Sequence, residues 1–182
     1  KEICLNKKFG MSAWGKLYDK KLFDSIQFPI GVLYEDLQTT PYLIHKCNKI
    51  VYCQGATYYW YQRKGSIMHS YNYKNNVWYE AADQFVKFVM LNYSDLYEYA
   101  ICRYVNDSFW SVVQRIALTD NCYNNIIYAR EQCCFYWKKG LKNKYLKARK
   151  KINVLLMLIS PRCYILIYRF YWRFLKKQKE LH

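Results

Sequence analysis

The spacing of hydrophobic residues changes along this chain and predicts different structure in its two halves. From Asp36 onward, a helical spacing predicts a helix that starts near this acid; the residues that recur are Leu37, Thr40, Leu43, Ile44 and Cys47. Two runs rich in β-branched and aromatic residues follow, over 49–53 and 57–63. The short connection between them contains a glycine and predicts a pair of antiparallel strands.

Beyond residue 74 the pattern is helical. We expect one helix over 78–92, a second over 96–105, a third that Asp107 or Ser108 caps, and a fourth over 121–137. Few glycines and prolines interrupt these segments, so long regular elements are expected.

The chain divides into three predicted parts, 1–72, 73–137 and 138–182, with the first boundary in a polar run near 72–76. In the last part, the apolar run 152–160 is short, whereas a helix needs about 20 apolar residues to cross a bilayer. Residues 163–179 predict a helix with arginines on one side and apolar and aromatic residues elsewhere, a pattern typical of a helix lying on an anionic leaflet. The alternative is a C-terminal helix that packs its apolar face on the body of the protein.

The positive charge is concentrated in this third part. The chain has 29 Lys and Arg against 13 Asp and Glu, a net charge of +16, and residues 138–182 hold 14 of the basic residues and a single acid, Glu180. A cationic tail favours an anionic lipid surface or a nucleic acid as its partner. We expect the membrane surface and no nucleic acid, because the cations lie in a helix with an apolar side and the sequence has no known nucleic-acid-binding motif.

The eight cysteines and three histidines predict no metal site in this chain. The cysteines show no CxxC spacing, and the one close pair, Cys133 and Cys134, is adjacent in sequence. Free thiols in a reducing compartment are therefore expected. His69 stands in a predicted loop away from the cysteines.

Glu35 and Asp36 are adjacent acids in a basic chain, placed where a loop meets a predicted helix. A carboxylate at a helix N-terminus is stabilised by backbone N–H groups and by the helix dipole. Asp36 could therefore be a simple helix cap, or an oriented carboxylate that takes a proton from a hydroxyl.

Three motifs surround this pair: W-G-K-L-Y (14–18), F-P-I-G-V-L-Y-E-D (28–36) and Y-Y-W-Y-Q-R-K-G-S-I (58–67). In this order and spacing, the sequence resembles the C-terminal half of family 2 glycosyltransferases with the GT-A fold, bacterial enzymes of surface and capsular polysaccharide synthesis. The resemblance covers about 11–70. It implies an α/β fold, in which 1–72 is the C-terminal, acceptor-side half of a GT-A Rossmann-like domain, followed by a mostly α-helical extension.

The resemblance also implies roles for individual residues. Asp36 matches the general base of an inverting enzyme, which deprotonates the acceptor hydroxyl as that oxygen attacks a nucleotide-sugar donor, and Glu35 would support it. Trp14 and Lys16 would line the acceptor side, where an aromatic face suits a sugar ring.

Arg63 and Ser66 match the segment that approaches the donor diphosphate in relatives. The acceptor is expected to be a saccharide, lipid-linked, at the cytoplasmic face of the bacterial plasma membrane. The D-x-D-type motif that binds Mg²⁺ or Mn²⁺ in relatives is missing here. The metal is therefore expected for the full-length enzyme, with ligands mostly outside this chain, and the chain by itself is expected to be an inactive fragment.

Two non-enzymatic alternatives stay open on the sequence. The first is a basic protein that binds nucleic acid through its tail, for which Tyr58, Tyr59, Trp60 and Tyr61 could stack on bases unless they form a buried strand. The second is a helical scaffold at the membrane surface with no chemistry.

Overall fold

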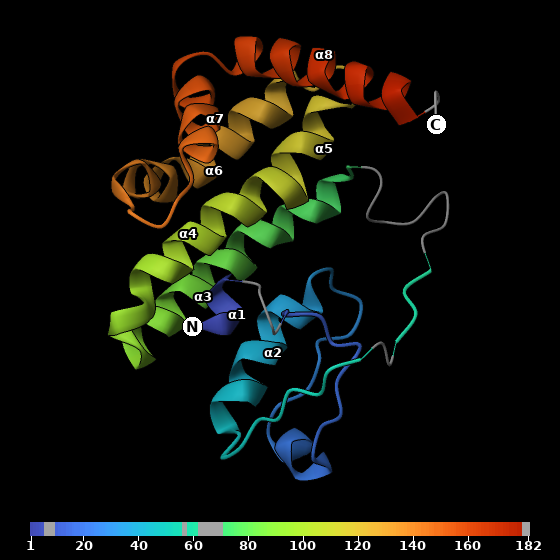
Figure 1. Cartoon of the computed structure of the whole chain (residues 1–182), viewed down its shortest axis with the longest axis vertical. Coiled ribbons are helices and arrows are strands. Elements are labelled where there is room, and N and C mark those ends of the chain that lie inside the picture. Colours follow the sequence, from blue (N-terminus) through green and yellow to red (C-terminus); the bar gives the residue numbers. More distant parts are fainter. Residues whose placement is uncertain (6–9, 56–57, 62–70, 180–182) are drawn as a thin grey trace.

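The computed structural model describes residues 1–5, 10–55, 58–61 and 71–179, and every regular element in these ranges is a helix (Figure 1). The expected α/β, GT-A half-domain is therefore wrong, since the described ranges contain no strand. Residues 49–53 and 58–61 run as irregular chain where strands were predicted. A strand forms where a neighbouring strand takes up its backbone hydrogen bonds, and the described ranges contain no strand that could form a sheet with these residues.

The α-helices follow one another along the chain in this order: α1 (Glu2–Leu5), α2 (Glu35–Lys46), α3 (Val77–Asn92), α4 (Tyr97–Ser108), α5 (Gln114–Ala117), α6 (Tyr123–Lys142), α7 (Ala148–Ile159) and α8 (Pro161–Lys179). Short 3₁₀ turns and one π-helical segment connect some of them: η1 (Lys20–Asp24), η3 (Tyr73–Asn76), η4 (Ser94–Leu96) and the π-helical η5 (Phe109–Val113). The predicted helices over 78–92, 96–105 and 121–137 are confirmed as α3, α4 and α6.

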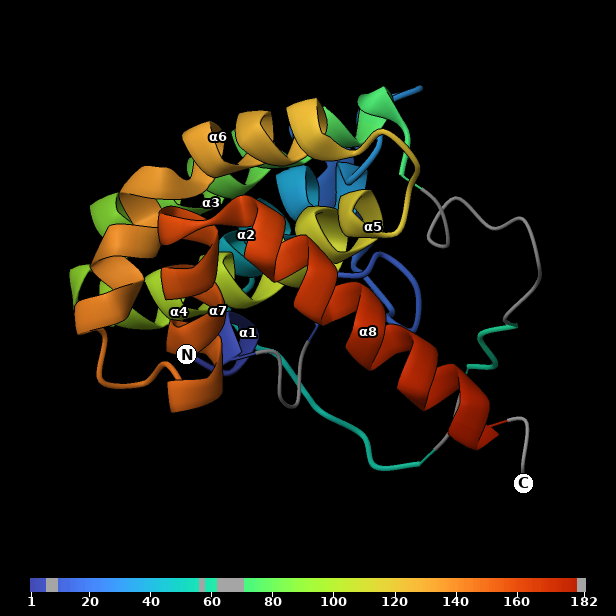
Figure 2. The same ribbon diagram turned by 90° about the horizontal axis from the view of Figure 1, so that it is seen from above.

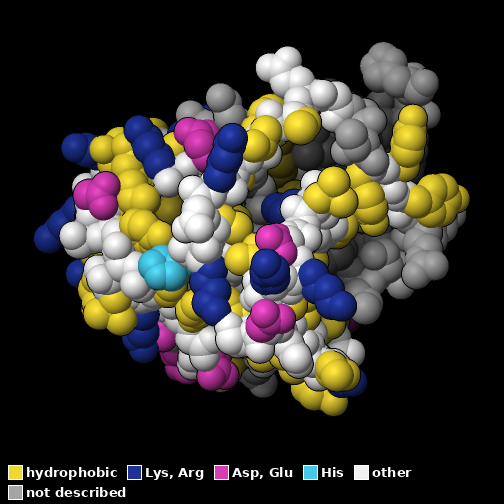
Figure 3. All heavy atoms as spheres, turned by 90° about the horizontal axis from the view of Figure 1, so that it is seen from below, with side chains coloured by type: hydrophobic (Ala, Val, Ile, Leu, Met, Phe, Trp, Pro, Cys, Tyr) yellow, Lys and Arg dark blue, Asp and Glu magenta, His cyan; other side chains and the backbone are white. Residues whose placement is uncertain are grey.

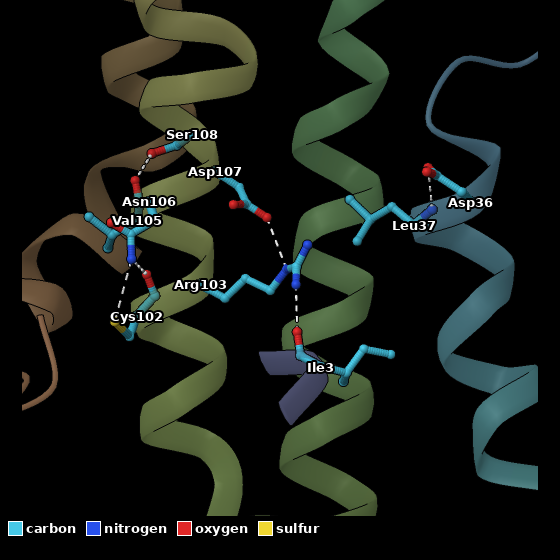
Figure 4. A network of polar contacts seen from close by, with 9 residues as sticks. All are labelled: Ile3, Asp36, Leu37, Cys102, Arg103, Val105, Asn106, Asp107 and Ser108. Carbon is cyan, nitrogen blue, oxygen red and sulfur yellow. Dashed lines mark hydrogen bonds and ion pairs between the residues drawn. The ribbon is translucent and has the colours of Figure 1, made fainter. Parts of the chain in front are cut away.

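The prediction of a separate helix capped by Asp107 or Ser108 is wrong. Helix α4 passes through η5 into α5 without a break, so neither residue caps a new start. The carboxylate of Asp107 instead pairs with Arg103 one turn earlier, at 2.9 Å (Figure 4). The Ser108 hydroxyl accepts a hydrogen bond from the indole of Trp137 at 2.9 Å.

The core lies between α3, α4 and α6, which pack on one another. Trp137 on α6 is fully buried and stacks on Phe109 of η5 with ring centroids 5.2 Å apart. Trp78 on α3 packs against Tyr104 of α4 at 5.1 Å. These aromatic contacts join elements distant in sequence and give the bundle one continuous core.

Below the bundle in Figure 1, α2 packs on α3 and carries with it the irregular segment that precedes it. The sequence supports this helix at both ends, because Glu35 and Asp36 occupy its first turn, and His45 and Lys46 its last. Pro41 lies inside α2 and is buried, rather than in the first turn where it would be tolerated best.

At the other end of the bundle, α8 lies across α5 and packs on α7 (Figures 1 and 2). The Arg169 guanidinium donates to the carbonyl of Ala117 at 2.7 Å and to that of Thr119 at 2.6 Å, which attaches α8 to the end of α5. Within the described ranges, no helix is long and apolar enough to cross a membrane. The division into three parts stays a prediction.

Candidate functional site

The start of α2 is held in place by the tyrosine that precedes it. Tyr34 adopts a left-handed backbone conformation with φ of 60°, which turns the chain sharply into the helix. Its hydroxyl accepts a hydrogen bond from the Asn75 side chain at 3.1 Å and donates to the carbonyl of Ser111 at 3.4 Å. Two elements of the bundle therefore position the first turn of α2, which carries both acids.

Asp36 is half-buried in that first turn. Its Oδ1 accepts a hydrogen bond from the backbone N–H of Leu37 at 2.7 Å (Figure 4). Burial raises the pKa of the Asp36 carboxyl, the Leu37 hydrogen bond opposes this, and the neighbouring charge of Glu35 raises the pKa further. A carboxylate with a raised pKa is a stronger base than one in open water, so this side chain is suited to take a proton.

Lys16 lies close enough to Asp36 for their charges to interact. Burial lowers the pKa of the Lys16 ammonium, and the Asp36 carboxylate partly reverses that shift. The ammonium donates to the backbone carbonyl and the hydroxyl of Ser12 rather than forming a direct ion pair with the acid. The structure thus brings Lys16 and Asp36 together from segments 20 residues apart in the sequence; their roles stay predictions.

Trp14 belongs to an exposed aromatic cluster. Its ring stacks with Tyr58 at 5.1 Å and with Trp60 at 5.7 Å between centroids. All three rings are about half exposed, so the interpretation of residues 58–61 as a buried strand is wrong. Gly15, whose φ is +70°, lies in the loop that carries both Trp14 and Lys16.

The aromatic cluster joins two irregular segments, because Trp14 lies in the loop that carries Lys16, whereas Tyr58 and Trp60 lie in 58–61. Lys16 of the first segment links it to the start of α2, since its charge interacts with that of Asp36. Flat, exposed aromatic rings can pack against the C–H side of a pyranose, and a nearby carboxylate can accept the proton of a sugar hydroxyl. This combination is suited to binding a saccharide and activating one of its hydroxyls.

The other predicted site residues are not part of this arrangement as it is seen. Arg63 and Ser66, predicted to approach the donor diphosphate, lie outside the described residues, as does His69. Glu35 stands beside Asp36 on α2 and is half-buried.

No group of three or more His, Cys, Asp or Glu side chains in the described ranges is placed to hold a metal ion. The described residues therefore do not fit the Mg²⁺ or Mn²⁺ ion that the sequence resemblance implies. The expectation that its ligands lie mostly outside this chain stays a prediction.

Two cavities occur elsewhere in the described structure, and Asp36 lines neither. One, of about 170 Å³, lies between the end of α5 and α8. The other, of about 350 Å³, lies between α3 and α6, and its lining combines four tyrosines with acidic and amide side chains and Val77. We place the candidate site at Asp36 despite these cavities, because an acceptor hydroxyl needs an accessible base and a binding surface rather than an enclosed volume.

Sequence reasoning missed four aromatic residues of this site. Tyr34 anchors the acid-bearing turn, Tyr18 lies near enough to Asp36 for the carboxylate to add to the rise that burial causes in the tyrosine pKa, and Tyr58 and Trp60 complete the aromatic cluster. All four lie within the three motifs around the acid pair. The many aromatic residues in those motifs could have pointed to an aromatic site. Which of them contact one another could not be predicted, because that depends on how the loops fold.

Comparison with known proteins gives one partial match and two negative results. The chain is 42 % identical over 59 residues to the glycosyltransferase GlyA of Streptococcus pneumoniae serotype 4 (strain ATCC BAA-334 / TIGR4). The alignment covers 31 % of this chain and 8 % of that protein. No family model matches the sequence, and no solved structure matches the fold. The similarity supports a relationship to a glycosyltransferase at this coarse level.

Proposed function

We propose that this chain forms the acceptor-binding part of an inverting glycosyltransferase, with Asp36 as the general base. The observation that carries the proposal is the half-buried Asp36 carboxylate with its raised pKa, held at the start of α2 beside Lys16. The partial similarity to a glycosyltransferase supports the same reaction class.

In the proposed reaction, the acceptor hydroxyl gives its proton to the Asp36 carboxylate as its oxygen bonds to the anomeric carbon of a nucleotide-sugar. The bond from that carbon to the diphosphate breaks, and the nucleoside diphosphate leaves with the electron pair. Attack opposite to the leaving group inverts the anomeric centre.

Lys16 would keep the Asp36 carboxylate available for this step. A nearby cation favours the ionised form, which opposes the rise in pKa that burial causes. Glu35 has the contrary effect on its neighbour, because its charge makes protonation of Asp36 easier. The Arg103 guanidinium also lowers the pKa of Asp36, so the proposed site sets two cations, Lys16 and Arg103, against the charge of Glu35.

The Trp14, Tyr58 and Trp60 cluster would hold the acceptor saccharide by stacking. We expect Trp14→Ala to raise the KM for the acceptor about two- to tenfold with little change in kcat, since one stacking contact contributes about 0.5–1.5 kcal/mol. Trp110→Ala removes another exposed indole ring, on η5, and is the matched control. A fall in kcat with unchanged KM would argue against a stacking role.

The test of the base is Asp36→Asn in the complete transferase that contains this chain, assayed for sugar transfer from a nucleotide-sugar to a lipid-linked saccharide. We expect kcat to fall by about 10²- to 10⁴-fold, because an amide cannot accept the proton. Asp95→Asn, which changes an exposed carboxylate in η4, should leave kcat unchanged. Full activity in Asp36→Asn would refute the assignment and favour a scaffold without chemistry.

A further inference from the structure

We propose that one side of α8 is a docking surface for an anionic lipid bilayer. The inference stands on α8 alone and does not depend on the chemistry proposed for Asp36. We call this side the outer face of α8; it is formed by Leu166, Ile167, Phe170, Tyr171 and Phe174.

The helix has two apolar sides, although a surface helix needs only one to pack on a protein. Tyr164 and Ile165 are buried against the bundle, and Tyr164 contacts the ring of Phe109 at 5.6 Å. The alternative predicted that the apolar face of this helix packs on the body. Only the inner side packs there, and the outer face stays exposed.

The outer face leaves large apolar side chains in water. Phe170 is 76 % exposed, Leu166 68 %, and Ile167 and Phe174 are each 54 % exposed. In Figures 1 and 2, α8 lies at one extremity of the molecule, and no described element crosses it. Contiguous exposed apolar surface of this kind marks an interaction site.

Arginines border the outer face on one side. At 100° per residue, Arg162, Arg169 and Arg173 fall on one stripe between the inner and outer sides. Arg162 lies over the ring of Tyr123 at 4.7 Å, and Arg169 is bonded to the end of α5, whereas Arg173 is exposed. A helix that lies in a bilayer interface has this arrangement, with apolar residues toward the acyl chains and cations at the level of the lipid phosphates.

The cavity between α5 and α8 lies along this arginine stripe. Its lining includes Arg169, Arg173 and Trp172, together with one carboxylate, Asp120. It could admit part of a lipid headgroup beside the exposed Arg173, and Trp172 suits the headgroup layer because it has an apolar body and a polar edge.

Charge complementarity selects an anionic bilayer as the occupant. The sequence of α8 contains no acidic residue, so its surface presents one sign of charge. By contrast, the face of the molecule on the side away from α8 mixes Lys and Arg with Asp and Glu (Figure 3). A nucleic acid could pair with the arginines but would leave the outer face in water. An anionic bilayer pairs with the arginines and also removes the outer face from water.

The test is flotation of the chain with vesicles of 30 % phosphatidylserine in phosphatidylcholine, compared with pure phosphatidylcholine vesicles and with duplex DNA. We expect binding to the anionic vesicles that weakens as salt is raised, because the lipid charge is screened. Phe170→Glu should lower the partition coefficient about tenfold or more, and the double variant R162Q/R173Q about tenfold.

Leu91→Glu is the matched control, since Leu91 is 79 % exposed on α3 at the far end of the bundle. It should bind vesicles like the unaltered chain, and a circular dichroism melt would verify that each variant folds. Equal loss in Leu91→Glu and Phe170→Glu, equal binding to neutral and anionic vesicles, or a preference for DNA at physiological salt would overturn the proposal.

Discussion

At the scale of single residues, Asp36 combines two demands that oppose each other. A base needs a raised pKa, and burial supplies it, but burial of an ionised carboxylate also costs folding free energy. The Leu37 N–H and the nearby Lys16 reduce that cost without removing it. Reactive groups in proteins commonly have this conflict between activity and stability.

This conflict predicts the effect of pH on stability. Because the pKa of Asp36 is higher in the folded state than in the unfolded state, its contribution to stability is complete below the unfolded pKa and is lost as pH rises through the folded pKa. Asp36→Asn imitates the protonated form, so its free energy of unfolding should exceed that of the unaltered chain increasingly as pH rises from 3 to 8. Urea denaturation across this range measures the difference.

Asp95→Asn is the control for that series, because it makes the same change at an exposed carboxyl. A pH-independent difference between Asp36→Asn and the unaltered chain would show that the folded state does not perturb the carboxyl.

At the scale of elements, the contact between α4 and α6 depends on a glycine. A Cβ added at Gly140 would lie 2.7 Å from Cγ2 of Val105, which is fully buried in α4. Valine is stiff about its first side-chain torsion, so this methyl cannot swing away. The two helices therefore approach closely at a point where the sequence shows only a glycine inside a helical pattern.

We expect Gly140→Ala to destabilise the chain by about 1 kcal/mol, because overpacking costs about 1–3 kcal/mol and outweighs the gain of about 1 kcal/mol in helix propensity. In a Val105→Ala background the same substitution should become stabilising, since the clashing methyl is gone. Urea denaturation of the two single variants and the double variant forms the cycle. The same sign in both backgrounds would contradict the close contact.

At the scale of the whole molecule, a few side chains with long reach join segments that the sequence separates widely. Arg103 of α4 pairs with Asp107 and donates to the carbonyl of Ile3, which holds α1 against the bundle (Figure 4). At the other end of the bundle, Arg169 donates to the carbonyls of Ala117 and Thr119, which holds α8 against the end of α5. These two arginines therefore attach α1 and α8 to the core.

Arg169→Met should loosen α8 while leaving the bundle folded. The substitution keeps an apolar stem but leaves the carbonyls of Ala117 and Thr119 without their charged donor, at a cost of about 2 kcal/mol or more. Hydrogen exchange should show lost protection in 164–174 and none in α3. Arg173→Met, which changes an exposed arginine of the same helix, is the control; equal loss of protection in both variants would mean that Arg169 is not the attachment.

Local pattern was enough to predict most helices of this protein. Each of α3, α4 and α6 buries one stripe of residues along its length. In the sequence, such a stripe is seen as apolar residues that repeat about every 3.6 positions, which predicts a helix. The acids at the start of α2 and the arginine stripe of α8 could also be predicted from the sequence, because both depend on spacing within one helix.

The sequence by itself therefore determined most of the helical segments, the place of the acids on α2 and the part of the chain where the positive charge is concentrated. Only the tertiary structure decided that 49–53 and 58–61 are not strands, that α4 continues through η5 into α5, and that Lys16 lies near Asp36. The physical reason is range. Helical hydrogen bonds close within four residues, whereas strand pairing, aromatic stacking and charge proximity depend on partners that the chain brings together only when it folds.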